Sequence, residues 1–87
     1  MSDDFHVNGW PNDAQATSLS AVIRATRQYR PILVFDASDM PKIVWPDMHE
    51  VELIADPQGK LDVWRGGNLT DQIGMTPEQA VTAIFDR

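Results

Sequence analysis

The sequence has 87 residues, a length that suits one domain with a modest core and is too short for two. It contains no cysteine, which excludes disulfide bonds and thiolate metal sites, and its apolar fraction of 43% excludes an outright disordered chain. The net charge is −6, and the acidic middle of the chain disfavours direct binding to nucleic-acid phosphates. The acidic residues of that middle part are Asp36, Asp39, Asp47, Glu50, Glu52, Asp56 and Asp62.

Residues 1–16 are predicted to form an extended N-terminal arm, followed by a single α+β domain over residues 17–87. Turn formers are frequent in the arm, and Phe5 and Trp10 are among its apolar anchors. The first residues lack the basic and apolar regions of a signal peptide, and the longest apolar run, residues 32–35, is too short to cross a membrane. We therefore expect a soluble, cytoplasmic protein with no membrane partner.

An amphipathic helix is predicted from a cap at Thr17 or Ser18 to about Tyr29. Apolar residues recur at i, i+3, i+4 and i+7 from Leu19, and Pro31 cannot continue a helix. Three arginines near its end form a basic ridge, which we expect to be solvated or paired within the protein. They are Arg24, Arg27 and Arg30.

Four strands are expected after this helix. Residues 32–35 form a continuous apolar run, which is typical of an interior strand buried on both faces. Residues 42–45 lie between two prolines and suit an edge strand. Residues 49–55 and 60–65 are predicted to form a hairpin, because Asp56-Pro57-Gln58-Gly59 matches a type I turn followed by a left-handed glycine.

The turn fixes the register of this hairpin, so that Leu53 faces Val63 and the side chains alternate between two faces. One face is apolar and is predicted to be the core side. It carries Val51, Leu53, Ala55, Leu61 and Val63. The opposite face carries Glu50, Glu52, Ile54, Asp62 and Trp64.

Gly66-Gly67-Asn68 is predicted to end the sheet, and Thr76-Pro77-Glu78-Gln79 then begins a second helix with a capping box. Its apolar face is expected at Ala80, Val81, Ile84 and Phe85. The predicted fold is therefore α+β, with a small, mostly antiparallel sheet of three to four strands and two helices packed on one face. The element order is arm-α-β-β-β-β-α.

Asp36 and Asp39 are the most enzyme-like residues, because carboxylates at a strand end commonly hold Mg²⁺ or act as nucleophiles. However, Ser38 stands where a second carboxylate would be needed, and turn or capping roles are ordinary for these residue types. His6 and His49 lie in different segments and form no ligand pair. The sequence thus predicts no catalytic residue, no metal ligand and no cofactor.

The outer face of the hairpin is the predicted partner-binding site. Ile54 and Trp64 lie diagonally across the two strands, within side-chain reach. They are surrounded by Glu50, Glu52 and Asp62, an arrangement of apolar anchors within a charged rim that is typical of protein interfaces. The alternative is that the second helix or the N-terminal arm covers this face.

These features favour a small acidic, non-enzymatic protein-binding module: a regulator, inhibitor or accessory subunit, of the kind that phages and mobile elements often encode. The expected partner is another protein, with no direct nucleic-acid contact, and a homodimer is left open. One alternative is an acidic mimic of nucleic acid that blocks a nucleic-acid-binding protein. A second, less favoured, is a metal-assisted hydrolase at Asp36 and Asp39.

Overall fold

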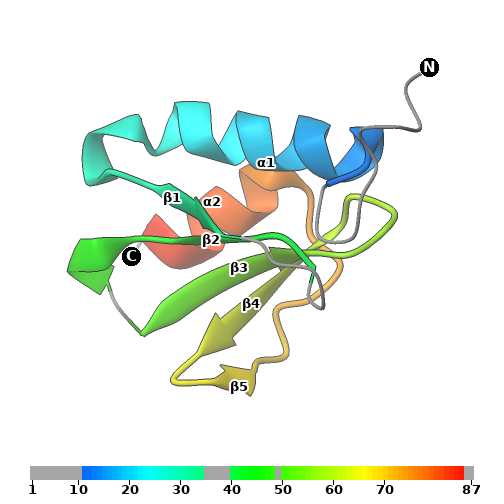
Figure 1. The fold of residues 1–87 in the computed structure, drawn as a ribbon. Helices are drawn as coiled ribbons and strands as arrows, with labels where there is room; N and C mark the ends of the chain where they lie inside the picture. Colours follow the sequence, from blue (N-terminus) through cyan, green and yellow to red (C-terminus); the bar gives the residue numbers. More distant parts are fainter. Residues whose placement is uncertain (1–10, 35–39, 49, 86–87) are drawn as a thin grey trace.

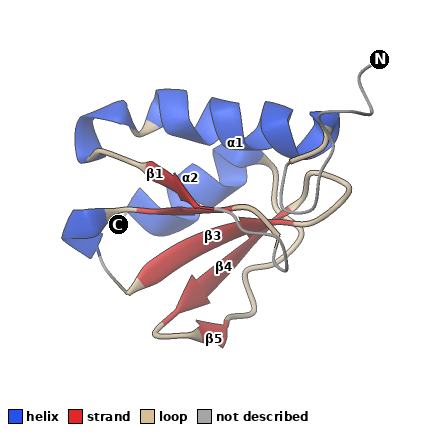
Figure 2. Ribbon diagram, in the orientation of Figure 1, coloured by secondary structure: helices blue, strands red, loops and turns tan. Residues whose placement is uncertain are grey.

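The computed structural model describes residues 11–34, 40–48 and 50–85. Within them, two α-helices accompany a five-stranded antiparallel sheet in the order β1-β2-β3-β4-β5, which confirms the α+β class and adds a strand to the predicted three or four (Figure 1, Figure 2). None of the described helices is long and apolar enough to cross a membrane. The elements are α1 (Asp13–Ala25), η2 (Arg27–Tyr29), β1 (Ile32–Val34), β2 (Lys42–Val44), η3 (Pro46–Met48), β3 (Val51–Ala55), β4 (Leu61–Arg65), β5 (Asn68–Leu69) and α2 (Pro77–Phe85).

Helix α1 begins earlier than predicted. Asn12 is its N-cap: the Asn12 side chain accepts the Gln15 N–H at 2.8 Å, and the Gln15 side chain accepts the Asn12 N–H at 2.9 Å. This reciprocal capping box satisfies two amide groups at once, which Thr17 further along the chain could not do. The predicted cap at Thr17 or Ser18 is therefore wrong, and residues 13–16 belong to the helix rather than to an arm.

The end of α1 also differs from the prediction. The helix closes at Ala25, and a single 3₁₀ turn, η2, continues to Tyr29. Arg30 then adopts a left-handed conformation with φ of 61°, directly before Pro31. The proline thus stops helical structure where expected, but the last turn is tightened into a 3₁₀ turn.

The predicted positions of the first two strands in the sheet are exchanged. β1 is an edge strand with all three residues exposed, whereas β2 lies between β1 and β3. The sheet is a meander in chain order, so the first strand has a neighbour on one side only. β2 tolerates an interior position because Pro41 and Pro46 flank the strand and remove no N–H group from within it.

The β3–β4 hairpin has the predicted register, with Leu53 opposite Val63. Its turn is closed by Asp56, whose carbonyl accepts the Gly59 N–H at 2.9 Å and whose carboxylate accepts two further backbone N–H groups. Gly59 has φ of 84°, a conformation that glycine adopts without strain. The turn packs against α1, where Ser18 Oγ donates to the Gly59 carbonyl at 2.6 Å.

Gly66 and Gly67 do not end the sheet, contrary to the prediction. Both have positive φ, 59° and 83°, the backbone that a two-residue type I′ hairpin requires. They return the chain to β5, and Arg65 pairs with Asn68 across the turn. After β5 the chain still follows β4, since Met75 and Leu61 exchange two backbone hydrogen bonds of 2.9 Å.

Helix α2 begins with the predicted capping box. Thr76 Oγ1 accepts the Gln79 N–H at 3.2 Å, the Gln79 side chain accepts the Thr76 N–H at 3.0 Å, and Pro77 is the first helical residue. Of its predicted apolar face, Ala80 and Ile84 are buried, while Val81 and Phe85 are partly buried.

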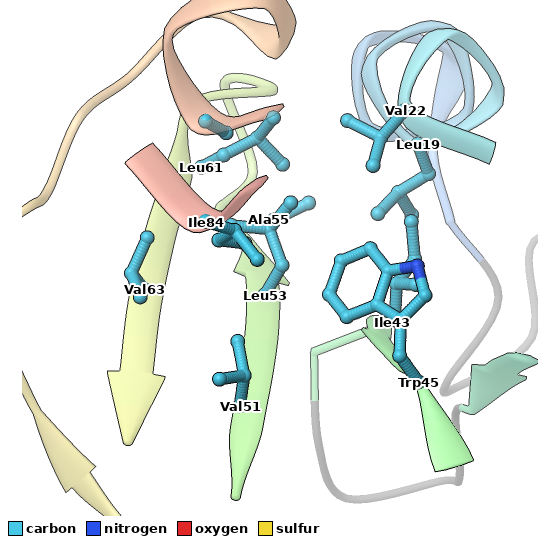
Figure 3. Packing of buried hydrophobic residues seen from close by; sticks show 11 residues of the cluster. Leu19, Val22, Ile43, Trp45, Val51, Leu53, Ala55, Leu61, Val63 and Ile84 are labelled. Atoms are coloured by element: carbon cyan, nitrogen blue, oxygen red, sulfur yellow. The ribbon is translucent and has the colours of Figure 1, made fainter. Parts of the chain in front are cut away.

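One apolar cluster joins both helices to one face of the sheet (Figure 3). Trp45 is fully buried in it: its Nε1 donates to Thr26 Oγ1 at 3.1 Å, and its ring meets Phe85 edge-on at 5.4 Å. The bond satisfies the single polar group of the indole. The buried apolar members are Leu19, Val22, Ile43, Trp45, Val51, Leu53, Ala55, Leu61, Val63, Ala80 and Ile84.

Candidate functional site

The face of the sheet opposite the core cluster is the candidate site, and we call it the outer sheet face. Strand register defines its members, because directly paired residues of neighbouring strands point to the same side. One row across the sheet runs Ile32, Val44, Glu52, Trp64 and Leu69. The adjacent row runs Val34, Lys42, Ile54 and Asp62.

The first row is apolar at four of its five positions and crosses all five strands. Trp64 is partly buried and has Glu52 on one side and Leu69 on the other. In the second row, charged and apolar side chains alternate. The outer sheet face therefore combines an aromatic anchor with charged neighbours, the composition found in the centre and rim of protein interfaces.

A hollow of about 290 Å³ lies around Trp64. An ion pair borders it, with Lys42 Nζ and Glu52 Oε1 3.3 Å apart and both side chains about one-third exposed. A partly exposed pair of this kind contributes little to stability. The lining residues are Met40, Lys42, Glu52, Ile54, Trp64 and Gly67.

The structure brings three of the five predicted site residues, Glu52, Ile54 and Trp64, together at this hollow. Asp62 is paired with Ile54 on the same face, and its Oδ1 accepts the Gly74 N–H at 2.9 Å. Glu50 is exposed directly before β3, and its carbonyl accepts the Gly66 N–H at 2.8 Å. The predicted diagonal relation of Ile54 and Trp64 follows from the observed register.

Neither described helix lies over the outer sheet face. The buried residues of α1 and α2 belong to the core cluster on the other face, and Figure 1 shows β3, β4 and β5 fanning out below the two helices. Cover by the second helix, one of the alternatives considered above, is therefore not what the structure shows. Phe5 and Trp10 of the predicted arm lie outside the described residues.

Several residues of the outer sheet face could not be assigned from the sequence. They lie in β1 and β2, whose places in the sheet were predicted wrongly, in β5, which was not predicted, or, for Met40, in the segment before β2. Met40 and Lys42 border the hollow although neither was predicted to be near Trp64. The sequence did hold one signal for Lys42. Side chains alternate between the two faces of a strand, so the polar Lys42 beside the apolar Ile43 indicates that Lys42 lies on the face opposite the core. The residues that extend the site are Ile32, Val34, Met40, Lys42, Val44 and Leu69.

Three carboxylates of the acidic middle segment are already engaged within the protein. Asp56 accepts hydrogen bonds in its turn, Asp62 accepts one from Gly74, and Glu52 pairs with Lys42. Carboxylates held in this way are less available to imitate a phosphate backbone than freely exposed ones. This arrangement favours an interface built around Trp64 over nucleic-acid mimicry.

The other candidate groups give no second site in the part of the chain that the structure describes. Asp36, Asp39 and both histidines lie outside it, and no three potential metal ligands cluster within it. A larger hollow of about 630 Å³ lies between residues 71–75 and α2, but its charged lining residues, Asp71 and Glu78, are both acidic and no aromatic side chain lines it.

Among the described residues, the outer sheet face thus has the composition of a protein interface, and comparison with known proteins adds no assignment to it. Searches of protein-family models, curated proteins and solved structures found no match to this chain.

Proposed function

We propose that the protein is a small binding module that contacts another protein through its outer sheet face and acts as a regulator, inhibitor or accessory subunit. The observation that carries this proposal is Trp64, partly buried in an apolar row on a sheet face that neither described helix covers. The sequence analysis likewise favours a binding role over catalysis. No cofactor is part of the proposal.

Trp64 is suited to anchor a partner because an aromatic side chain loses much water-exposed surface at small entropic cost. Ile54 lies diagonally across the β3–β4 ladder and would enlarge the desolvated centre. Glu50, Glu52 and Asp62 would form the polar rim, with Lys42 as its cation. A rim of this kind excludes water from the centre and discriminates between partners by charge.

The proposal is tested by affinity capture from a lysate of the native host, with mass spectrometry of the retained proteins. Three forms are compared: the wild type, Trp64→Ala, and Thr17→Ala, which alters an exposed position of α1. The expected result is a protein retained by the wild type and by Thr17→Ala but lost with Trp64→Ala. Retention that is equal on all three forms would contradict the proposed site.

A further inference from the structure

Strand β1 presents an unusually apolar edge. Ile32, Leu33 and Val34 are 47%, 37% and 37% exposed, and no described strand pairs with their outer side. Natural edge strands are normally protected by charge, by proline or by shortness. β1 is short and follows Pro31, but all three of its side chains are apolar. Its shortness and Pro31 limit uncontrolled pairing with other strands, but its exposed apolar side chains leave a surface on which one further strand could pair.

The pairing of β2 with β3 shows which peptide groups of β1 point away from the sheet. The Ala55 N–H donates to the Pro41 carbonyl at 3.1 Å, so this pair is a hydrogen-bonded one. Hydrogen-bonded and non-hydrogen-bonded pairs alternate in antiparallel sheets. The peptide groups of Ile43 therefore point to β3, and those of its two neighbours point to β1. On β1, this leaves the N–H and C=O of Leu33 directed away from the sheet.

Two basic residues precede this edge closely in the chain. Arg27 and Arg30 are exposed and lie within five residues of β1 in the chain. Among the described residues, the ion pair joins Lys42 to Glu52, and neither arginine has a carboxylate partner there. Guanidinium groups close to a strand edge favour a ligand with carboxylates at the matching end.

From this geometry we infer that β1 binds an extended peptide segment of another protein, which adds a strand antiparallel to it. The segment would exchange two hydrogen bonds with Leu33, place apolar side chains beside Ile32 and Val34, and end in acidic residues facing Arg27 and Arg30. An antiparallel strand brings its C-terminal end to the start of β1, where the arginines are. Strand addition of this kind takes affinity from main-chain bonds and specificity from side chains.

The inference shares Ile32 and Val34 with the outer sheet face, but it does not depend on Trp64 and has its own assay. The probe is a short fluorescein-labelled peptide of alternating valine and threonine that ends in three glutamates, and its binding is followed by anisotropy. Leu33→Pro removes the outward N–H and places a ring over the edge, while the bonds between β1 and β2 stay intact. We expect it to weaken binding by about tenfold or more, since one bond is lost and its partner is left unpaired.

Matched variants separate the backbone and charge contributions. Leu33→Val keeps the N–H and is expected to bind like the wild type. Arg27→Gln combined with Arg30→Gln is expected to weaken binding several-fold, whereas Arg65→Gln, an exposed arginine at the end of β4, is expected to have no effect. A peptide that ends in three lysines is expected not to bind.

Several results would overturn the inference. They are absence of saturable binding by the wild type, equal binding by Leu33→Pro, or equal binding of the lysine peptide. A dimer in sedimentation that Leu33→Pro converts to monomer, with no binding of the acidic peptide, would assign the edge to a second copy instead.

If Leu33→Pro fails to fold, amide exchange on the wild type decides: the peptide must slow exchange of the Leu33 N–H. Trp64→Ala leaves these measurements unchanged, so failure here and failure of the proposed function are distinguishable.

Discussion

At the scale of single residues, Trp64 in β4 and Trp45, directly after β2, have opposite environments and provide a matched test. Trp64 is partly buried on the outer sheet face, whereas Trp45 is fully buried and bonded to Thr26. We expect Trp64→Ala to weaken partner binding by about 2 kcal/mol or more while lowering stability much less. Trp45→Ala is expected to lower the free energy of unfolding by about 3–5 kcal/mol, because it leaves a cavity in the core and removes the hydrogen bond to Thr26.

Thermal melts of both variants, set beside a titration of the captured partner with Trp64→Ala, check this contrast. Ile54→Ala is expected to behave like Trp64→Ala with a smaller loss of binding. A collapse of the melting temperature in Trp64→Ala, leaving no folded protein to titrate, would make Trp64 a core residue and refute the outer-face interface.

Two glycines with nearly equal φ separate backbone strain from steric clash. Gly59 has φ of 84° and Gly67 has φ of 83°, but a Cβ on Gly59 would lie 2.7 Å from the Ala14 carbonyl oxygen, whereas nothing lies within 4 Å of one on Gly67. Gly67→Val is therefore expected to cost about 1–3 kcal/mol of stability from strain alone. Gly59→Val should cost clearly more, because the turn must also move away from α1.

Urea unfolding of the two variants measures the difference directly. The experiment also tests the docking of the hairpin turn on α1, which depends on the same close approach. Equal losses of stability in Gly59→Val and Gly67→Val would mean that the turn does not pack against the helix in solution.

At the scale of elements, the beginning of α1 makes the next prediction. Asn12 caps the helix and its Nδ2 also donates to the Pro57 carbonyl at 2.9 Å, so one side chain connects the helix with the β3–β4 turn. Asn12→Ala is expected to lower the free energy of unfolding by about 1 kcal/mol or more, the usual cost of losing an N-cap. Thr17→Ala, an exposed helix position, serves as the control and should stay within about 0.5 kcal/mol. Chemical denaturation followed by circular dichroism gives both values, and equal stability of the two variants would show that the cap contributes nothing.

Elements defined by local chemistry could be predicted from the sequence, while those defined by distant neighbours could not. The β3–β4 hairpin follows from a four-residue turn and alternating side chains, and the α2 start follows from Thr76 and Gln79. The position of β1 in the sheet depends on which strands pair with it, and an apolar run in the sequence does not indicate those partners. Asn12 and Gln15 have the spacing of a capping box, which indicates the observed start of α1. The cap was instead predicted at Thr17 or Ser18, because the apolar periodicity begins only at Leu19.

In the candidate site, too, contacts set by local sequence could be predicted and contacts between distant segments could not. Ile54, Trp64 and Glu52 share a face because of the hairpin register, and this could be derived from the sequence. The extension of the face to Lys42 requires the pairing of β2 with β3, a contact between separate segments. Long-range pairing of this kind leaves no local pattern in a single sequence.

At the scale of the whole molecule, the net charge of −6 raises the question whether a partner recognises the acidic character itself or the apolar face. The acidic side chains Glu52, Asp56 and Asp62 are already bonded within the protein, which leaves the apolar row as the stronger determinant. We therefore expect the affinity for the captured partner to change by less than about threefold between about 50 mM and 200 mM salt, because burial of apolar surface is little affected by screening. A mimic of nucleic acid would replace many phosphate contacts and lose affinity by about 10³-fold or more over the same range. Isothermal titration of the purified partner at both salt concentrations distinguishes the two cases, and a loss of the larger size would assign recognition to the carboxylates rather than to Trp64.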